Sequence, residues 1–315
     1  MLRVLEGRRR LYGDDHRKTL QAVYALAMTY QFRDELDRAE PLFVQALEAG
    51  LRVHGDRDPD TLLFMLGLGA NYHALERYDE AEPLLVRALK GQRAVRGDKH
   101  PETLATRTVL AAVYLQMNRF PEAEREAQQT YLDQLEVWGK TNPITLTGQG
   151  LLARVYLAQK RRGDADPLLR GLREQAPLLQ ERPLPIAIWA IGNVGDALLG
   201  QPDFVEAESF LRLYLDLAGK KLPDGWRRSA RVSALGACLL GQKKYAEAEP
   251  LLLKGYEGLR QHEERIPASV RRTRLTEALE RLVQLYDEWA KPDEAAKWRK
   301  ELEAAKAPPK PTAQP

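Results

Sequence analysis

The most suggestive chemical motif is the stretch WGKTNPIT, Trp138 to Thr145, which contains the triplet Gly139-Lys140-Thr141. A Gly-Lys-Thr triplet closes the P-loop of many nucleotide hydrolases, whose backbone N–H groups wrap the phosphates. That loop requires a second glycine five residues upstream, where this chain has Gln134. We therefore predict no phosphate site here and no cofactor.

Other apparent catalytic or metal-binding motifs are also incomplete. The segment HEERI, residues 262–266, imitates a zinc-protease helix, but Ile266 stands where the second histidine is required. The RGD tripeptides at 96–98 and 162–164 fall at a repeat junction and at a helix start, so they do not indicate adhesion. No protein-kinase glycine-rich loop, HRD or DFG is present. We predict no catalytic residue and no metal site.

Composition restricts the classes of partner. The chain has 315 residues, 44% hydrophobic and 30% charged, which is long for one compact domain and suggests two domains or a repeat array. Forty-eight Lys and Arg against 45 Asp and Glu leave a net charge of +3. This balance gives no general attraction to nucleic acid or anionic lipid. We predict no nucleic-acid partner, and a steep salt dependence of binding would contradict this.

Cysteine usage and hydropathy indicate a cytoplasmic protein. The single cysteine, Cys238, cannot form an internal disulfide and is expected to be a buried thiol. The N-terminal apolar run is interrupted by Glu6 and three arginines, which argues against a secretory signal. The most apolar segment, 184–192, is far shorter than the ~20 residues of a membrane helix. We predict no membrane partner.

An internal repeat organises the chain. The stretches YGDDHRKT, HGDRDPDT, RGDKHPET and WGKTNPIT place glycines at 13, 55, 97 and 139, each 42 residues after the last. A threonine follows each glycine by six residues, and three copies contain a proline. Glycine closes a helix in a left-handed conformation, proline suits the first turn of the next helix, and Asp58 or Asn142 is placed to cap it. The opening motif therefore predicts a helix-to-helix junction.

Two amphipathic helices fit between consecutive junctions. Apolar residues recur at three- and four-residue spacing in TLLFMLGLGANYHAL and in DEAEPLLVRALKGQRAV, and short polar turns such as ERYDEA join them. Short turns make the two helices antiparallel neighbours.

Three residue columns run through the units and predict close packing. One is aromatic or leucine, one is small, and one is alanine, so that helices can approach closely. These columns are, in order, Tyr30, Tyr72, Tyr114, Tyr156, Leu198, Leu239 and Tyr286; Ala27, Gly69, Ala111, Ala153, Gly195 and Gly236; and Ala39, Ala81, Ala123, Ala165, Ala207, Ala248 and Ala295.

With these columns, the chain resembles the tetratricopeptide repeat (TPR), in the 42-residue form found in kinesin light chains. YDEAEPLLVRAL at 78–89 and YAEAEPLLLKG at 245–255 carry the resemblance, which covers about residues 13–302. Repeats five to seven also resemble the TPR region that follows the kinase domain in certain bacterial serine/threonine protein kinases. The resemblance implies an all-α, right-handed solenoid of about seven helix hairpins, with repeats starting near 19, 61, 103, 145, 187, 229 and 275.

In such an array the first helix of each hairpin lines a concave groove that binds peptides. Helical offset from the tyrosine column places the following residues on this groove: Gln21, Tyr24, Gln31, Leu66, His73, Thr108, Gln116, Arg154, Trp189, Asn193 and Asp196. The mixture of apolar and hydrogen-bonding groups suits a peptide site. The alternative is that large members such as Leu66 and Trp189 pack between neighbouring helices.

Two features bear on the kind of partner. Kinesin light chains carry paired asparagines on this face, and here only the Gly192-Asn193 position retains one, which argues against kinesin-type cargo recognition. In repeat seven the same face shows acidic residues, which either attract a basic partner or solvate the end of the stack: Glu277, Glu280, Asp287 and Glu288.

Both ends have their own organisation. Residues 1–12 align with the second helix of a repeat whose first helix is missing, so the sequence is either a fragment or begins with an unusual cap. Residues 303–315 are proline-rich and are expected to be a disordered tail. Extra residues near RIPASVRR, 265–272, predict irregular stacking between repeats six and seven.

The sequence therefore predicts a non-catalytic protein-interaction scaffold that binds a peptide or protein in the groove. The alternative is a regulatory or substrate-docking C-terminal region of a bacterial serine/threonine protein kinase whose catalytic domain lies outside this chain. The partner's identity and the oligomeric state do not follow from the sequence.

Overall fold

A computed structural model describes residues 1–201, 203–219 and 221–307, which form helices joined by short turns and contain no strand. The helices are α1 (Leu2–Tyr12), α2 (Arg17–Phe32), α3 (Leu36–Val53), α4 (Pro59–Ala74), α5 (Tyr78–Arg96), α6 (Pro101–Gln116), α7 (Phe120–Trp138), α8 (Pro143–Ala158), α9 (Arg162–Gln175), α10 (Leu178–Glu181), α11 (Pro185–Leu199), α12 (Phe204–Ala218), α13 (Trp226–Gly241), α14 (Tyr245–Gln261), the 3₁₀ turn η1 (Glu263–Arg265), α15 (Ala268–Glu288) and α16 (Pro292–Lys306).

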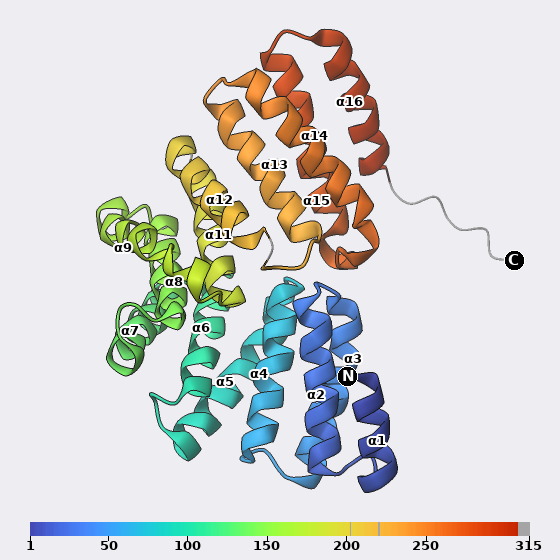
Figure 1. Cartoon of the computed structure of the whole chain (residues 1–315), viewed down its shortest axis with the longest axis vertical. Helices are drawn as coiled ribbons and strands as arrows, with labels where there is room; N and C mark the ends of the chain where they lie inside the picture. Colours follow the sequence, from blue (N-terminus) through green and yellow to red (C-terminus); the bar gives the residue numbers. More distant parts are fainter. Residues whose placement is uncertain (202, 220, 308–315) are drawn as a thin grey trace, which may run out of the picture.

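Seven antiparallel hairpins follow the lone helix α1 and stack into a curved array (Figure 1). The first helices of the hairpins are α2, α4, α6, α8, α11, α13 and α15, and the second helices are α3, α5, α7, α9, α12, α14 and α16. The predicted all-α solenoid is confirmed. Among the described residues, no helix has the length and apolar character that crossing a membrane would need.

The glycine junctions form as tight helix-to-helix turns, with one difference in backbone geometry. Gly97 has φ 86° and ψ 169°, which is the extended region of positive φ rather than the left-handed helical region that the sequence predicted. The Oγ1 of Thr103 donates to the carbonyl of Gly97 at 2.9 Å. Asn142 caps α8 by accepting from the Ile144 backbone N–H at 2.9 Å, as its position predicted.

The turn inside the first four hairpins and the last two depends on a residue with left-handed φ that is not glycine. Asp34, Glu76, Asn118 and Lys160 have φ between 58° and 61° and lie 42 residues apart. The next residue donates its backbone N–H back to the tyrosine carbonyl of the first helix, as Arg77 does to Tyr72 at 2.9 Å. The tyrosine column therefore marks the place where each first helix ends.

The small and alanine columns lie between the helices of each hairpin. The alanines are fully buried, from Ala39 to Ala295. A Cβ added at Gly69 would lie 2.8 Å from the Leu85 side chain, and one at Gly236 would lie 2.7 Å from Leu252. Glycine therefore permits the close approach that the sequence predicted.

The stacking is irregular between repeats four and five. The glycine period ends at Gly139, because the next position, 181, is Glu181 at the end of the short helix α10. Here α11 packs mainly on α8 and α12, whereas other first helices pack on the preceding second helix. The extra residues near 265–272 form the end of η1 and the start of α15, which has 21 residues where α13 has 16.

Helix boundaries differ from the predicted repeat starts. The first helices of repeats one to five begin two residues before their predicted starts, at Arg17, Pro59, Pro101, Pro143 and Pro185. Helix α13 begins three residues before its predicted start. Helix α15 begins at Ala268, seven residues before the predicted start at 275. Residues 303–306 are helical rather than part of a tail, and the remainder of the predicted tail, 308–315, lies outside the described residues.

Candidate functional site

Consecutive first helices contact one another directly, more extensively than consecutive second helices do. The first helices therefore lie on the inner, concave side of the curve. In Figure 1 the turns at the ends of α2 and α4 meet the starts of α13 and α15 near the middle of the molecule.

Polar contacts join the two ends of the array across this concave side. Asp34 accepts from the Nε of Arg227 at 2.5 Å, and Glu76 pairs with Arg274. The Oγ of Ser269 donates to the carbonyl of Leu75 at 3.0 Å. We call these contacts the closure; they connect repeats one and two with repeats six and seven.

Predicted groove residues from repeats two and four meet beside the closure. The ring of His73 lies 5.9 Å from that of Tyr78, centroid to centroid. Burial, together with the nearby guanidinium groups of Arg154 and Arg227, lowers the pKa of His73 from 6.5 to about 4. His73 is therefore neutral at pH 7.

Predicted residues of repeat five also lie at this centre, held by an arginine of repeat six. Arg231 donates from Nη2 to Asn193 Oδ1 at 2.5 Å and from Nε to Asp196 Oδ2 at 3.1 Å. A Cβ at Gly192 would lie 2.5 Å from Arg231 Nε, so glycine there leaves room for the guanidinium. The one retained asparagine is thus already engaged within the chain.

Trp189 lies at the edge of this group. Its ring packs against Phe32 at the end of α2, with centroids 6.1 Å apart. The concave centre, as we use the term below, comprises these converging residues: Phe32, His73, Tyr78, Arg154, Trp189, Asn193, Asp196, Arg227 and Arg231.

The remaining predicted residues lie outside this centre. Tyr24 packs against Phe43 and Phe64, and burial raises the pKa of its hydroxyl. Leu66 is 9% exposed and belongs to the hydrophobic core, so it offers almost no binding surface. Gln21 donates to Asp60 at 3.0 Å.

Two further predicted residues lie on α6, and one at the end of α2. Thr108 donates to the Leu104 carbonyl within its own helix at 2.8 Å. Gln116 is exposed and Gln31 is half-buried.

Sequence reasoning missed the arginines that form the ion pairs of the closure and of the concave centre. Arg227, Arg231 and Arg274 come from α13 and α15, whose sequences depart from the 42-residue pattern. The density of arginine in WRRSARV and VRRTRL was the available signal. Their partners Asp34 and Glu76 lie 42 residues apart, at the same position of consecutive repeats, so the glycine period could have identified them as equivalent.

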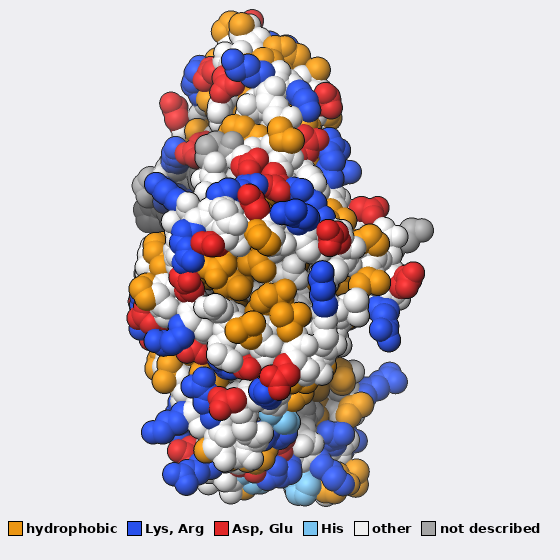
Figure 2. Space-filling model, turned by 90° about the vertical axis from the view of Figure 1, so that its left-hand side faces the viewer, with side chains coloured by type: hydrophobic (Ala, Val, Ile, Leu, Met, Phe, Trp, Pro, Cys, Tyr) orange, Lys and Arg blue, Asp and Glu red, His pale blue; other side chains and the backbone are white. Residues whose placement is uncertain are grey.

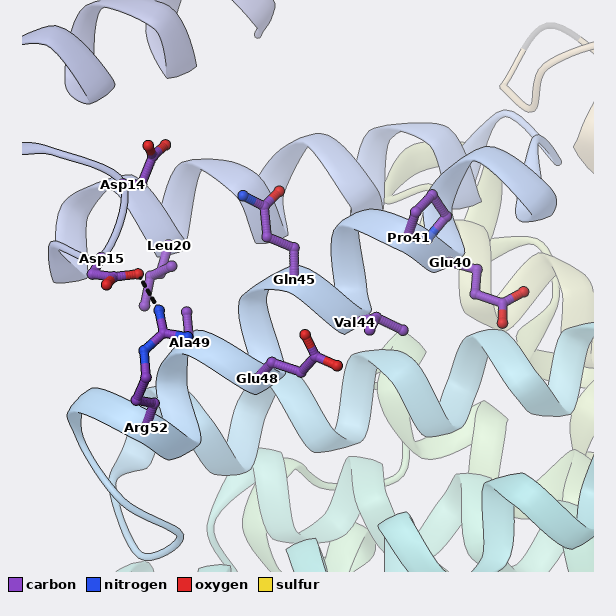
Figure 3. A pocket seen from close by; sticks show the side chains of 10 residues that line it. All are labelled: Asp14, Asp15, Leu20, Glu40, Pro41, Val44, Gln45, Glu48, Ala49 and Arg52. Atoms are coloured by element: carbon purple, nitrogen blue, oxygen red, sulfur yellow. Dashed lines mark hydrogen bonds and ion pairs between the residues drawn. The ribbon is translucent and has the colours of Figure 1, made fainter.

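A pocket with a volume of about 440 Å³ lies elsewhere, beside α3 (Figure 3). It is lined by Asp14, Asp15, Leu20, Glu40, Pro41, Val44, Gln45, Glu48, Ala49 and Arg52. Arg52 already pairs with Asp15 at 2.5 Å, as Figure 3 shows. The remaining charges are the carboxylates of Asp14, in the turn before α2, and of Glu40 and Glu48, which lie two turns apart along α3.

No group of three or more His, Cys, Asp or Glu side chains that could hold a metal ion occurs in the described ranges. HEERI follows α14 and forms its C-cap residue His262, the 3₁₀ turn η1 and Ile266. Cys238 is fully buried and burial raises the pKa of its thiol to about 12, as expected for a core cysteine. On the face seen in Figure 2, basic and acidic side chains are interspersed around hydrophobic patches.

Comparison with known proteins identifies the family of repeats one to three. Residues 22–90 and 60–131 match the family model described as tetratricopeptide repeat. No curated protein sequence matches significantly.

Solved structures share the fold at low identity. BtubC (BKLC) from P. vanneervenii matches with a TM-score of 0.51 and 15% identity, over 71% of this chain and 90% of that one. The apo form of RapI matches with a TM-score of 0.58 and 12% identity, over 91% and 97%. NprR in complex with its cognate peptide NprX matches with a TM-score of 0.59 and 14% identity, over 96% and 84%.

Proposed function

Because this chain contains tetratricopeptide repeats, we propose that it is a non-catalytic scaffold that binds a peptide or protein segment on its concave side. The observation that carries this proposal is the concave centre, where side chains from repeats one, two, four, five and six converge. The centre combines aromatic rings with hydrogen-bonding groups, as peptide sites do.

The structural comparison supports the same proposal. NprR has this fold and was solved with its cognate peptide. A cytoplasmic location, and partners that are neither nucleic acid nor membrane, belong to the proposal as well. The interspersed charges in Figure 2 support it, because a nucleic-acid surface concentrates positive charge.

A peptide-display library of random 12-residue sequences tests the binding function. The library is selected on immobilised protein, and one enriched peptide is synthesised. Two variants of the protein carry the photocrosslinking residue benzoylphenylalanine, one at Gln116 on the first helix α6 and one at Leu132 on the second helix α7. Both positions are exposed and both lie in repeat three.

We expect the peptide to crosslink at position 116 and not at position 132. Crosslinking at 132 alone would place the site on the outer side and contradict the proposal. If the library yields no enriched peptide, the binding function itself is wrong.

A further inference from the structure

The closure joins the two ends of the array at two equivalent places. The turn of hairpin one meets the start of α13, where Asp34 accepts from Arg227 at 2.5 Å. The turn of hairpin two meets the first two turns of α15, where Glu76 pairs with Arg274. Asp34 and Glu76 lie one repeat of 42 residues apart, and α13 and α15 are consecutive first helices. The two ends therefore meet in register, repeat one with repeat six and repeat two with repeat seven.

The same contacts bind backbone groups at the end of α4. Arg227 donates from Nη2 to the carbonyl of Ala74 at 3.5 Å, and Ser269 donates from Oγ to the carbonyl of Leu75 at 3.0 Å. Carbonyl groups in the last turn of a helix lack a partner within the helix and carry partial negative charge, which favours an arginine. The closure therefore satisfies helix-end carbonyls as well as carboxylates.

The arginine-bearing edge of the closure has a small hydrophobic core of its own. The ring of Trp226 lies beneath the guanidinium of Arg227, whose Cζ is 4.5 Å from the ring centroid. Ile266, Ser269 and Val270 come from the extra residues 265–272, which the 42-residue pattern lacks. The buried members of this core are Trp226, Leu259, Ile266, Val270, Leu275 and Ala278. The residues that interrupt the repeat therefore build and position the edge that closes the array.

The contacts between the two ends also occupy part of the concave centre. Phe32 packs against Trp189 with ring centroids 6.1 Å apart, which joins repeat one to repeat five. Arg227 is bound by Asp34 of repeat one. Surface of these three side chains that is used in the contacts is not available to a partner. The closed array therefore presents only part of its candidate site.

We propose that the closure is an autoinhibitory contact: it holds the array closed over the concave centre, and a partner segment binds only after the two ends separate. This inference rests on the proposed function and adds its regulation. Ion pairs between partly exposed side chains are individually weak, so the open form remains accessible. The measured association constant is then that of the open form multiplied by the fraction of molecules that are open.

A reversible disulfide across the closure tests the inference in the intact chain. A Cβ added at Gly225 would lie 3.4 Å from Oδ2 of Asp34, so cysteines at these two positions are within reach of a disulfide. Gly225 has φ −176° and ψ 178°, an extended conformation that any residue adopts. The test protein is the double variant Asp34→Cys, Gly225→Cys; the one native cysteine, Cys238, is fully buried.

Affinity is measured for the synthetic peptide selected on the wild-type protein, before and after reduction of the double variant. Non-reducing mass spectrometry confirms the disulfide, and circular dichroism confirms that both forms are equally helical. The single variants Asp34→Cys and Gly225→Cys, oxidised and reduced in the same way, are the controls. Neither position belongs to the concave centre.

We expect the oxidised double variant to bind the peptide about tenfold more weakly, or less, than the same protein after reduction, because the disulfide removes the open form. The controls should bind equally before and after reduction. If the oxidised and reduced double variant bind equally tightly, or if no disulfide forms because the two ends do not meet, the inference is wrong while the binding function stands. If the library yields no peptide, the binding function fails first.

A second arm opens the array through charge alone. Glu76→Arg places an arginine opposite Arg274 and should raise the affinity for the same peptide by about two- to tenfold, the change that exposed ion pairs make in an equilibrium. The swap Glu76→Arg, Arg274→Glu restores opposite charges and should return the affinity toward that of the wild type.

Glu48→Arg is the control for this arm, because Glu48 is an exposed carboxylate on α3, outside the closure. It makes the same change of net charge and should leave the affinity unchanged. An equal effect of Glu76→Arg and Glu48→Arg, or a swap that binds as tightly as Glu76→Arg alone, would show that the ion pair does not restrict access.

Discussion

The junction glycine of the early repeats has a backbone conformation that other residues rarely adopt. At Gly97, φ is 86° and ψ is 169°. This region of backbone conformation is essentially restricted to glycine, because the Cβ of any other residue would clash with the backbone. An added Cβ would meet nothing within 4 Å, so the requirement concerns the backbone and not the space around it. The 42-residue spacing of these glycines therefore reflects a conformational need.

Replacing Gly97 by alanine should lower the free energy of unfolding by about 1–3 kcal/mol, the usual cost of strain in this region. The measurement is chemical denaturation followed by circular dichroism. Gly163→Ala is the control, because Gly163 lies within α9 and also has open space around it. There alanine should be neutral or stabilising, by up to about 1 kcal/mol. Equal effects of the two changes would contradict the backbone argument.

His73 should make stability depend on pH. Its pKa falls from the ordinary 6.5 to about 4 on folding, chiefly through burial. The unfolded chain therefore binds the proton first, so stability is complete above pH 6.5 and is lost as pH falls toward 4. The total loss is about 3 kcal/mol, an order-of-magnitude figure from 1.36 kcal/mol per pKa unit.

Denaturation of wild type and His73→Gln between pH 7 and pH 4 measures this contribution. The stability difference between the two proteins should change steadily below pH 6.5, in favour of the variant. A difference that stays constant over this range would show that His73 does not titrate as described.

At the scale of the helices, an arginine at the hairpin turn of repeats two, three and four connects neighbouring repeats. Arg77 lies over the ring of Tyr72, with 4.4 Å between its Cζ and the ring centroid, and donates from Nη1 to both oxygens of Glu40 at 2.8 Å. Arg119 and Arg161 repeat this arrangement with Glu82 and Glu124. These ion pairs join α5 to α3, α7 to α5 and α9 to α7.

Arg77→Ala should therefore weaken the coupling between repeats one and two, by about 1 kcal/mol. Arg38→Ala is the matched control, because Arg38 stacks on Tyr30 but pairs within its own repeat, with Glu35. Hydrogen exchange of α2 and α3 should accelerate more in Arg77→Ala than in the control. Equal acceleration would mean that the inter-repeat ion pair contributes nothing.

The sequence predicts local structure well in this protein because the same residues meet the same neighbours in each repeat. The junction at Gly139, the cap at Asn142 and the packing of Ala123 are all determined within one hairpin and the next. Contacts of this kind can therefore be predicted from the 42-residue period of the sequence.

The concave centre is less predictable for a physical reason. Asp34 and Arg227 are separated by 193 residues, and their meeting depends on the curvature accumulated over all the repeats between them. That curvature includes the irregular step at α10, where the period stops. Helical offset placed His73, Arg154 and Trp189 on the inner side, but it could not show that they converge.

At the scale of the whole molecule, the closure determines how far apart the two ends of the array lie. Its contacts are few and polar, and the Asp34 and Arg227 side chains are 18% and 31% exposed. Such contacts are individually weak, so the closure can open without unfolding the hairpins.

The double variant Asp34→Ala, Glu76→Ala should open the array. Its radius of gyration from small-angle X-ray scattering should increase while its helicity stays constant. The control, Glu48→Ala with Glu174→Ala, removes two exposed carboxylates that form no ion pair with other described residues. If both variants keep the wild-type radius, the ion pairs do not hold the array closed.

The central claim is that the concave side binds the partner, and hydrogen exchange of the protein with and without a library-selected peptide tests it most directly. The account predicts slower exchange in the first helices α4, α8, α11 and α13, which carry His73, Arg154, Asn193 and Arg231. Slower exchange confined to the second helices α7, α9 and α12 would contradict it.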